Sequence, residues 1–323
     1  MKNKLHSDFC EKSQKLSDWF CECSKNVSYP IYSSYDIRDA GFKISNVDAN
    51  IFPAGFNNIC PTDKETSVGL FANYIKGHYG SSIKKVLLVT EEHTNNLYYW
   101  ENVHTIMSLL EAAGQRVLIG FPRRLEKPIE VTTATGKVLT IISAYEDGAE
   151  VQRFKPDIIV SNNDFSDANE DWAQQVKLPI NPPRELGWYQ RKKDCYFKNY
   201  NQLAKEFAAL VGFDPFLMTV QTEVYNNFNM NDEDSRNHLA KQVDQMIESI
   251  AKQYSERKIA ERPFVFVKNN SGTYGLAVIR VGSGKEVNEW SYKARKKMKA
   301  AKGGREVEEV IIQEGIPTRV HSD

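Results

Sequence analysis

The stretch FVFVKNNSGTYGLAVIRV combines a strand pattern with residue types that bind phosphate. Residues 264–268 predict a buried strand that ends in Lys268, and residues 276–281 predict a returning strand. Glycines in the loop between them let backbone amides approach an anion, and the lysine supplies a positive charge. We therefore expect a flexible cover over phosphates that uses Lys268, Ser271, Gly272, Thr273 and Gly275. The alternative is a hairpin turn with a surface lysine.

A second segment, VIIQEGIP at residues 310–317, predicts a buried strand whose end carries Gln313 and Glu314. Backbone groups of such a hinge could pair with an adenine edge, while a carboxylate holds ribose hydroxyls in a mostly apolar cleft. The alternative is a charged strand end that is only solvated.

In this order, the lysine-bearing strand, the glycine-bearing loop, the return strand, a helix and the hinge resemble the nucleotide site of ATP-grasp enzymes. A lysine just before a helix also reaches the nucleotide in those enzymes, and Lys193 and Lys192 occupy that position here. The resemblance further implies that Gln313, Glu314 and Ile316 line the nucleotide pocket. For the two lysines, the alternative is a basic helix start.

The similarity extends over nearly the whole chain. Four stretches, in order, resemble the proteobacterial glutamate-cysteine ligases of the GshA type: YDIRDAGFKISNVDANIFPAGFNNIC, GWYQRKK, FVFVKNNSGTYGLAVIRV, and KKMKAAKGG followed by VIIQEGIPT. The resemblance implies ATP-dependent joining of the glutamate γ-carboxylate to the cysteine amine through an acyl-phosphate, with Mg2+ at the polyphosphate. Clustered cations suit this chemistry, because phosphoryl transfer needs charge stabilisation more than a protein nucleophile.

The first of these stretches is then expected to bind the amino acids. Arg38 could pair with a substrate carboxylate and act in catalysis beside Lys268, and Asp48 could accept from the glutamate ammonium. Amide side chains would complete the pocket: Asn50, Asn57 and Asn58. The alternative is a self-bonded loop with Arg38 in an internal ion pair.

The length of 323 residues predicts two domains. The predicted fold class is α/β: an N-terminal pre-ATP-grasp-like α/β substrate-binding domain at residues 1–180, then an incomplete ATP-grasp α+β domain at residues 181–323. In the first domain, two short apolar runs flank an amphipathic helix at 98–113 and predict a βαβ unit. A hairpin turning at Gly136 and a buried strand at 156–160 follow.

The remaining segments are predicted to be helices, apart from one loop. Residues 8–25 predict one amphipathic helix, residues 35–60 a shaped loop, and residues 286–301 a basic helix. In the second domain, helical periodicity covers residues 196–211, ending at Gly212, and residues 234–254.

Composition excludes several classes of protein. With 41% hydrophobic residues, a net charge of zero and no long apolar run, we expect a cytoplasmic protein with neither a membrane span nor a nucleic-acid site. Seven cations between residues 293 and 305 are expected to form a solvated face or to lie beside the phosphates. Five scattered cysteines do not form a disulfide or zinc pattern. A homo-oligomer is possible, but the sequence does not determine it.

The metal ligands are not identified by the sequence. In ATP-grasp enzymes the magnesium-binding carboxylates follow the hinge, whereas few residues follow Pro317 here. We expect either truncation or a homologue without this metal site, which leaves the activity of this chain alone open. The alternatives are a ligase for another amino acid or peptide, and a nucleotide-binding remnant without turnover.

Overall fold

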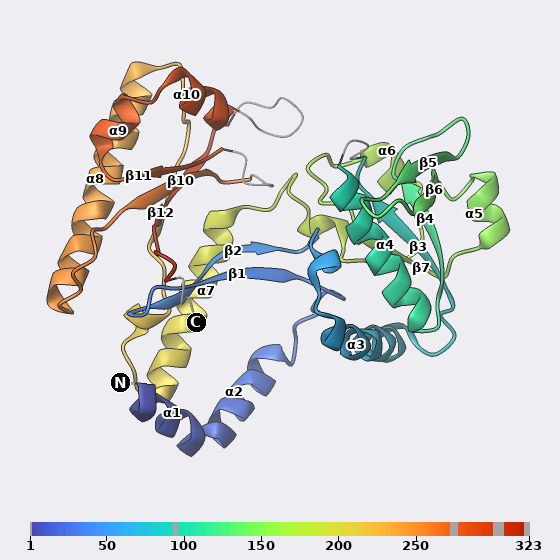
Figure 1. Ribbon diagram of the computed structural model, residues 1–323, viewed down its shortest axis with the longest axis horizontal. Coiled ribbons are helices and arrows are strands. Elements are labelled where there is room, and N and C mark those ends of the chain that lie inside the picture. Colours follow the sequence, from blue (N-terminus) through green and yellow to red (C-terminus); the bar gives the residue numbers. More distant parts are fainter. Residues whose placement is uncertain (1, 93–95, 272–276, 300–306, 320–323) are drawn as a thin grey trace. The chain divides into compact units, whose positions relative to one another are not determined.

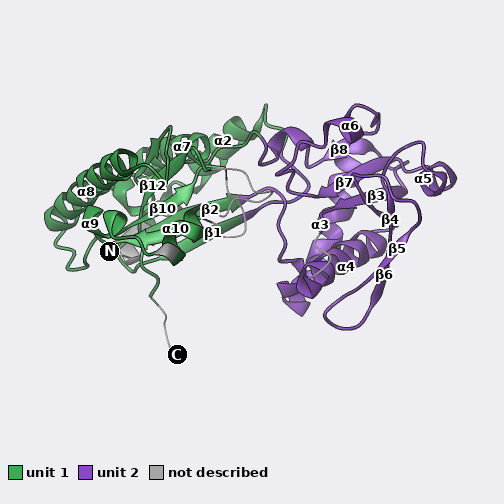
Figure 2. Ribbon diagram, turned by 90° about the horizontal axis from the view of Figure 1, so that it is seen from above, with its two compact units in different colours: residues 1–28, 35–49, 190–323 green, residues 29–34, 50–189 purple. Residues whose placement is uncertain are grey.

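The computed structural model describes residues 2–92, 96–271, 277–299 and 307–319 (Figure 1). Two compact units make up the chain (Figure 2). Unit 1 contains Met1–Ser28, Tyr35–Ala49 and Gln190–Asp323, and unit 2 contains Tyr29–Ser34 and Asn50–Tyr189. None of the helices in the described ranges combines the length and the apolar character that crossing a bilayer requires.

Unit 2 is built on a six-stranded sheet with the order β5-β6-β4-β3-β7-β8. The strands are β3 (Lys85–Thr90), β4 (Arg116–Phe121), β5 (Ile129–Thr132), β6 (Val138–Ser143), β7 (Ile158–Asn162) and β8 (Ile180–Asn181). β5 pairs antiparallel with β6, and the other neighbours are parallel. The predicted βαβ unit around α4 (Leu97–Ala112) is therefore confirmed, as is the hairpin at Gly136, whose φ of +83° suits glycine.

Helices cover both faces of this sheet, so the side chains of β3 alternate between two cores. Val86 and Leu88 pack with α3 (Pro61–Tyr79) and α4. Leu87 and Val89 pack in the other cluster, with α5 (Ala149–Phe154) and α6 (Glu170–Ala173). Because both faces are covered, the central strands β3 and β7 are almost continuously buried, and this explains why their apolar runs were clear in the sequence. The short 3-10 turns of this unit are η1 (Phe56–Asn58) and η2 (Arg184–Leu186).

Unit 1 contains an antiparallel sheet with the order β11-β10-β12-β9. The strands are β9 (Thr222–Tyr225), β10 (Val265–Asn269), β11 (Val278–Val281) and β12 (Val310–Glu314). One face packs on α8 (Glu233–Glu256) and α9 (Gly284–Asn288), and α10 (Tyr292–Lys299) follows α9. The predicted α/β class, with an α+β second part, is confirmed.

The other face of this sheet packs on α7 (Lys193–Val211) and on a two-stranded ribbon, β1 (Ser34–Asp39) and β2 (Ile44–Asn50). Val47 of β2, Phe197 of α7 and Ile311 of β12 share one buried cluster. α7 ends at Gly212 in the left-handed conformation, as predicted. Another 3-10 turn, η3 (Pro215–Leu217), follows α7.

The prediction of a loop at residues 35–60 was wrong for its first half, which forms β1 and β2. β2 buries polar residues, among them Ser45 and Asn46. Tyr200 of α7 accepts the Asn46 backbone N–H at 3.1 Å, and the Tyr196 hydroxyl donates to the Asn46 side chain at 2.9 Å. A strand that satisfies buried polar groups in this way lacks the alternating apolar pattern by which strands are recognised.

Two helix predictions also differ from the structure. The helix predicted at 8–25 is two helices, α1 (Lys2–Glu11) and α2 (Ser13–Ser24), because Lys12 leaves the helical conformation. The basic helix predicted at 286–301 is split into α9 and α10. In neither case does a proline mark the break.

The two units are not continuous in sequence, unlike the domains predicted at 1–180 and 181–323. Aromatic packing explains why the first helices belong to unit 1. The rings of Phe9, Trp19 and Phe20 lie 5.8 to 6.0 Å from that of Phe207 on α7. Such long-range contacts leave no local mark in the sequence.

We predict that α9 tolerates no side chain at its first residue. A Cβ on Gly284 would lie 2.3 Å from the Ala240 carbonyl oxygen of α8. Gly284→Ala should therefore lower the free energy of unfolding by about 1–3 kcal/mol, measured by urea denaturation. In the control, Gly282→Ala, a Cβ would meet only the flexible end of Glu286, so a change below about 0.5 kcal/mol is expected. Equal losses in both variants would contradict this packing.

Candidate functional site

Lys268 lies on β10, between β11 and β12, and is buried, with 7% of its surface exposed. Its Nζ donates to the Gln313 side-chain oxygen at 2.6 Å and to the Val47 carbonyl at 3.0 Å. Both acceptors are uncharged. Burial lowers the pKa of Lys268 to about 8, and the negative charge of Asp48 opposes this shift. A buried ammonium with neutral partners has capacity for an anionic ligand.

Gln313, which accepts the hydrogen bond from Lys268, has a side-chain donor that is not used. Its oxygen must face Lys268, because an ammonium group only donates hydrogen bonds. The side-chain Nε2 then faces away, and it has no hydrogen-bond partner among the described residues although Gln313 is fully buried. A buried donor without a partner costs about 1–3 kcal/mol. An acceptor on a bound molecule would remove this cost.

Lys193 is the first residue of α7 and lies in the same part of unit 1. Its Nζ lies 2.6 Å from Asp48 Oδ1, and its side chain is 6% exposed against 37% for Asp48. Burial lowers the pKa of Lys193, and Asp48 raises it. The predicted nucleotide lysines Lys193 and Lys268 are therefore both held by β2, one by a carboxylate and the other by the neighbouring backbone carbonyl.

Asn270 fixes the start of α7 beside the end of β10. Its carbonyl oxygen accepts the Lys193 N–H at 2.9 Å. Its side chain accepts the Asp194 N–H at 3.0 Å and donates to the Asp194 carboxylate at 2.8 Å. The sequence analysis missed this role, although the position of Asn270 directly before Ser271 was a usable signal. Lys192, in contrast, pairs with Glu309 at 2.6 Å and is 39% exposed.

Two arginines add to the positive charge near the buried lysines, Arg191 beside Asp48 and Arg38 acting on Lys268. Arg191 donates to the Ala49 carbonyl at 3.1 Å, and burial lowers its pKa while Asp48 raises it. Arg38, on β1, donates to the Thr318 hydroxyl at 3.1 Å. The alternative in which Arg38 forms an internal ion pair is not what the described residues show. Arg38 is bound through a neutral hydroxyl instead.

The predicted amide residues belong to the other unit. Asn50 bonds to the backbone of Phe52 in both directions, at 3.0 and 3.1 Å. Asn57 donates to Asn58 at 3.2 Å. These three asparagines lie in unit 2, whereas Arg38 and Asp48 lie in unit 1. Their joint role in an amino-acid pocket remains a prediction.

The hinge carboxylate has partners within the protein. Glu314 is 1% exposed, and its two oxygens accept from Lys43 Nζ at 2.7 and 2.8 Å. One oxygen also accepts the Gln221 N–H at 3.1 Å. Burial lowers the pKa of Lys43, against the opposing effect of Glu314. The described contacts give Glu314 a role in holding the hinge, and its predicted ribose contact remains untested.

The neighbouring hinge residues are packed closely. A Cβ on Gly315 would lie 2.1 Å from the Phe264 ring, so the chain passes against this ring only because residue 315 is glycine. Ile316 is buried in the cluster with Phe197 and Val47, and it therefore supports the hinge from the core.

Part of the predicted site lies outside the described residues. Gly272, Thr273 and Gly275 fall within 272–276, and Ser271, just before them, donates its N–H to Asn269 at 3.0 Å. In the described ranges there is no group of three His, Cys, Asp or Glu that could hold a metal ion.

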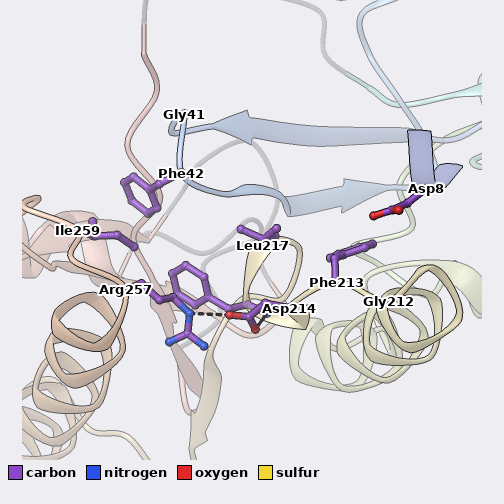
Figure 3. A pocket seen from close by; sticks show the side chains of 10 residues that line it. Asp8, Gly41, Phe42, Gly212, Phe213, Asp214, Leu217, Arg257 and Ile259 are labelled. Atoms are coloured by element: carbon purple, nitrogen blue, oxygen red, sulfur yellow. Dashed lines mark hydrogen bonds and ion pairs between the residues drawn. The ribbon is translucent and has the colours of Figure 1, made fainter. Parts of the chain in front are cut away.

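A separate cavity of about 570 Å³ opens in unit 1 (Figure 3). Phe42, Phe213 and Phe216 give it aromatic walls, and Asp214 and Arg257 form an ion pair of 2.7 Å beside them. The Phe216 ring is contacted by Arg257 at 4.3 Å and by Lys43 at 4.2 Å. None of the predicted nucleotide residues is among the described residues that line this cavity.

Comparison with solved structures identifies the class of fold. The chain is similar to a proposed gamma-glutamylcysteine synthetase from Methylobacillus flagellatus KT, with 31% identity and a TM-score of 0.86 over 98% of this chain and 75% of that one. It also matches D-alanyl-alanine synthetase A from Vibrio cholerae at 8% identity and a TM-score of 0.34, over 72% of this chain and 59% of that one, and nothing is concluded from this match. The fold is therefore of the ATP-grasp-related type.

The family follows from the sequence match. Residues 6–323 match the GshA family, glutamate-cysteine ligase. The chain belongs to this family, and the resemblance stated from its motifs is confirmed, as is the class of enzyme. A search of curated proteins finds no match.

We predict that Lys43 and Glu314 stabilise unit 1 only as a pair. Lys43→Met or Glu314→Gln alone should lower the free energy of unfolding by about 3–5 kcal/mol, because either change leaves a buried charge without its partner. The double variant should lose clearly less than the sum of the two losses, as measured by urea denaturation. For comparison, Lys285→Met breaks the exposed pair with Glu289 at 3.5 Å and should cost about 0–1 kcal/mol. Additive losses at Lys43 and Glu314 would disprove the coupling.

Proposed function

We propose that this chain binds ATP and uses it to join the γ-carboxylate of glutamate to the amine of cysteine. The observation that carries the proposal is the buried ammonium of Lys268, which has only neutral hydrogen-bond partners among the described residues. The positive charge of Lys193 also acts on Lys268 and lowers its pKa. Membership of the glutamate-cysteine ligase family supplies the substrates.

Two lysines would bind the phosphates. Lys268 and Lys193 would contact phosphate oxygens, and each contact would become stronger as negative charge shifts during phosphoryl transfer. The unused Gln313 Nε2 would donate to an acceptor of the same nucleotide. Arg38 would pair with a substrate carboxylate, since its guanidinium is bound only through the Thr318 hydroxyl in the described contacts.

The reaction would proceed in two steps. The glutamate γ-carboxylate attacks the γ-phosphorus of ATP, which forms an acyl-phosphate and releases ADP. The cysteine amine then attacks the acyl carbon, the carbon–oxygen bond to phosphate breaks, and the amine loses a proton. Magnesium remains an expectation from the family resemblance, and no step is assigned to it.

We predict that Lys268→Met abolishes measurable nucleotide use by this chain. The change removes a buried charge at the phosphates, so affinity for a non-hydrolysable ATP analogue should fall by about a hundredfold or more. Calorimetry would measure binding, and ADP release with glutamate and cysteine would measure turnover. The matched control is Lys285→Met, which removes an exposed lysine of α9 and should change neither quantity.

The outcomes separate the possible functions. Release of ADP that requires both glutamate and cysteine, together with formation of the dipeptide, supports the proposal. Release with another amino acid in place of cysteine indicates a different ligase. Binding without any release indicates a nucleotide-binding remnant, and equal nucleotide affinity in Lys268→Met would remove Lys268 from the site.

A further inference from the structure

Asp48 pairs with one of the two buried lysines and directly follows the residue that binds the other. Its Oδ1 lies 2.6 Å from Lys193 Nζ and also accepts the Ala49 N–H at 3.0 Å. The residue before it, Val47, offers its carbonyl to Lys268 Nζ at 3.0 Å. Two consecutive residues of β2 therefore provide the acceptors of both lysines. The acceptor of Lys193 is a carboxylate, whereas that of Lys268 is an uncharged carbonyl.

The charges around Asp48 are strongly unequal. Four cations surround it or affect its partners: Arg38, Arg191, Lys193 and Lys268. Asp36 of β1 is the second carboxylate that these lysines sense, and Tyr35 and Tyr196 also face the group. The cluster therefore has an excess of positive charge that a polyphosphate would neutralise.

Burial explains why a counter-ion is needed. An ammonium group removed from water favours its neutral form unless an opposite charge lies nearby. Asp48 is well suited to this role because its side chain is 37% exposed, so water can solvate the carboxylate after it separates from Lys193. Lys193, at 6% exposed, has no comparable access to water.

We propose that Asp48 is a resident counter-ion that keeps Lys193 and Lys268 charged in the absence of nucleotide and releases Lys193 to a phosphate oxygen when the triphosphate binds. The inference rests on the proposed function, since it concerns the same nucleotide. It assigns Asp48 a positioning role in nucleotide binding, in place of the predicted contact with the glutamate ammonium.

The consequence is a specific dependence of nucleotide affinity on pH. Phosphate favours the charged form of Lys268, so the affinity is highest while the free protein already carries that charge. The pKa of Lys268 is about 8, and the affinity of the natural chain should therefore fall as the pH rises above about 8, with uptake of a proton on binding. Loss of Asp48 should move the start of this fall to lower pH by about one unit, because an opposite charge is removed.

The experiment is calorimetric titration with a non-hydrolysable ATP analogue between pH 6.5 and 9.5, in buffers of different ionisation enthalpy. We compare the natural chain, Asp48→Asn and Asp36→Asn. Asp36 is the matched control, because it is an exposed carboxylate of the same cluster whose effect on both lysines is weaker than that of Asp48, and Asp36→Asn should therefore shift the profile clearly less than Asp48→Asn does. The titration of the ligand itself is common to all three proteins and cancels in the comparison.

A second variant keeps the test decisive if Asp48→Asn does not fold. Lys193→Met removes a like charge from Lys268 and leaves Asp48 to that lysine alone. The fall in affinity should then start at higher pH than in the natural chain, although binding is weaker overall. This shift is opposite in direction to that of Asp48→Asn, and a general loss of structure would not produce it.

The results distinguish the two proposals. If the natural chain does not bind the analogue, the proposed function fails. If the natural chain binds and neither variant shifts the profile, the function stands and the role of Asp48 is overturned. If Asp48→Asn weakens only the affinity for glutamate, Asp48 contacts the amino acid instead and the inference is also overturned.

Discussion

The Lys268 ammonium of unit 1 is buried against two uncharged oxygens. This contact joins three segments: β10 carries the lysine, β12 the Gln313 oxygen and β2 the Val47 carbonyl. A buried ammonium in such surroundings is weakly stabilised, because neutral acceptors replace only part of its hydration. This geometry supports the proposal of an anion site, which would cost some stability in the free protein.

The buried ion pair of Lys43 and Glu314, in the same unit, has the opposite character. Lys43 and Glu314 are matched in charge and geometry, and the backbone of Gln221 completes the bonding. The pair fixes the end of β12, and Phe216 covers Lys43. Unit 1 thus separates two tasks that the sequence analysis had combined in the hinge. Glu314 holds the strand end, whereas Gln313 has a buried donor without a partner among the described residues.

The sequence predictions were accurate where a local pattern determines the structure, and they failed where contacts between distant residues determine it. β10 and β12 were found because each is a short apolar run with polar residues at its end, and Lys268 was found because it ends such a run. β2 was missed because its buried polar residues are satisfied by α7, and β1 because it has no buried residue that would give an apolar pattern. The partner of Glu314 could not be predicted, since Lys43 lies 271 positions away and no local pattern connects them. The family motifs identified the segments that we propose to bind the nucleotide, but not which side chains already have partners.

The discontinuity of unit 1 has a consequence for its formation during synthesis. Residues 35–49 leave the ribosome well before residues 190–323, with which they share a compact unit, and the whole of segment 50–189 is made between them. Contacts between distant segments form late, because loop closure must precede them. Unit 2 has nearly all its chain in one piece and can pack as soon as that piece is released. The ribbon of β1 and β2, which supplies Val47 and Asp48, therefore lacks its partners Lys193 and Lys268 until the last part of the chain has been synthesised.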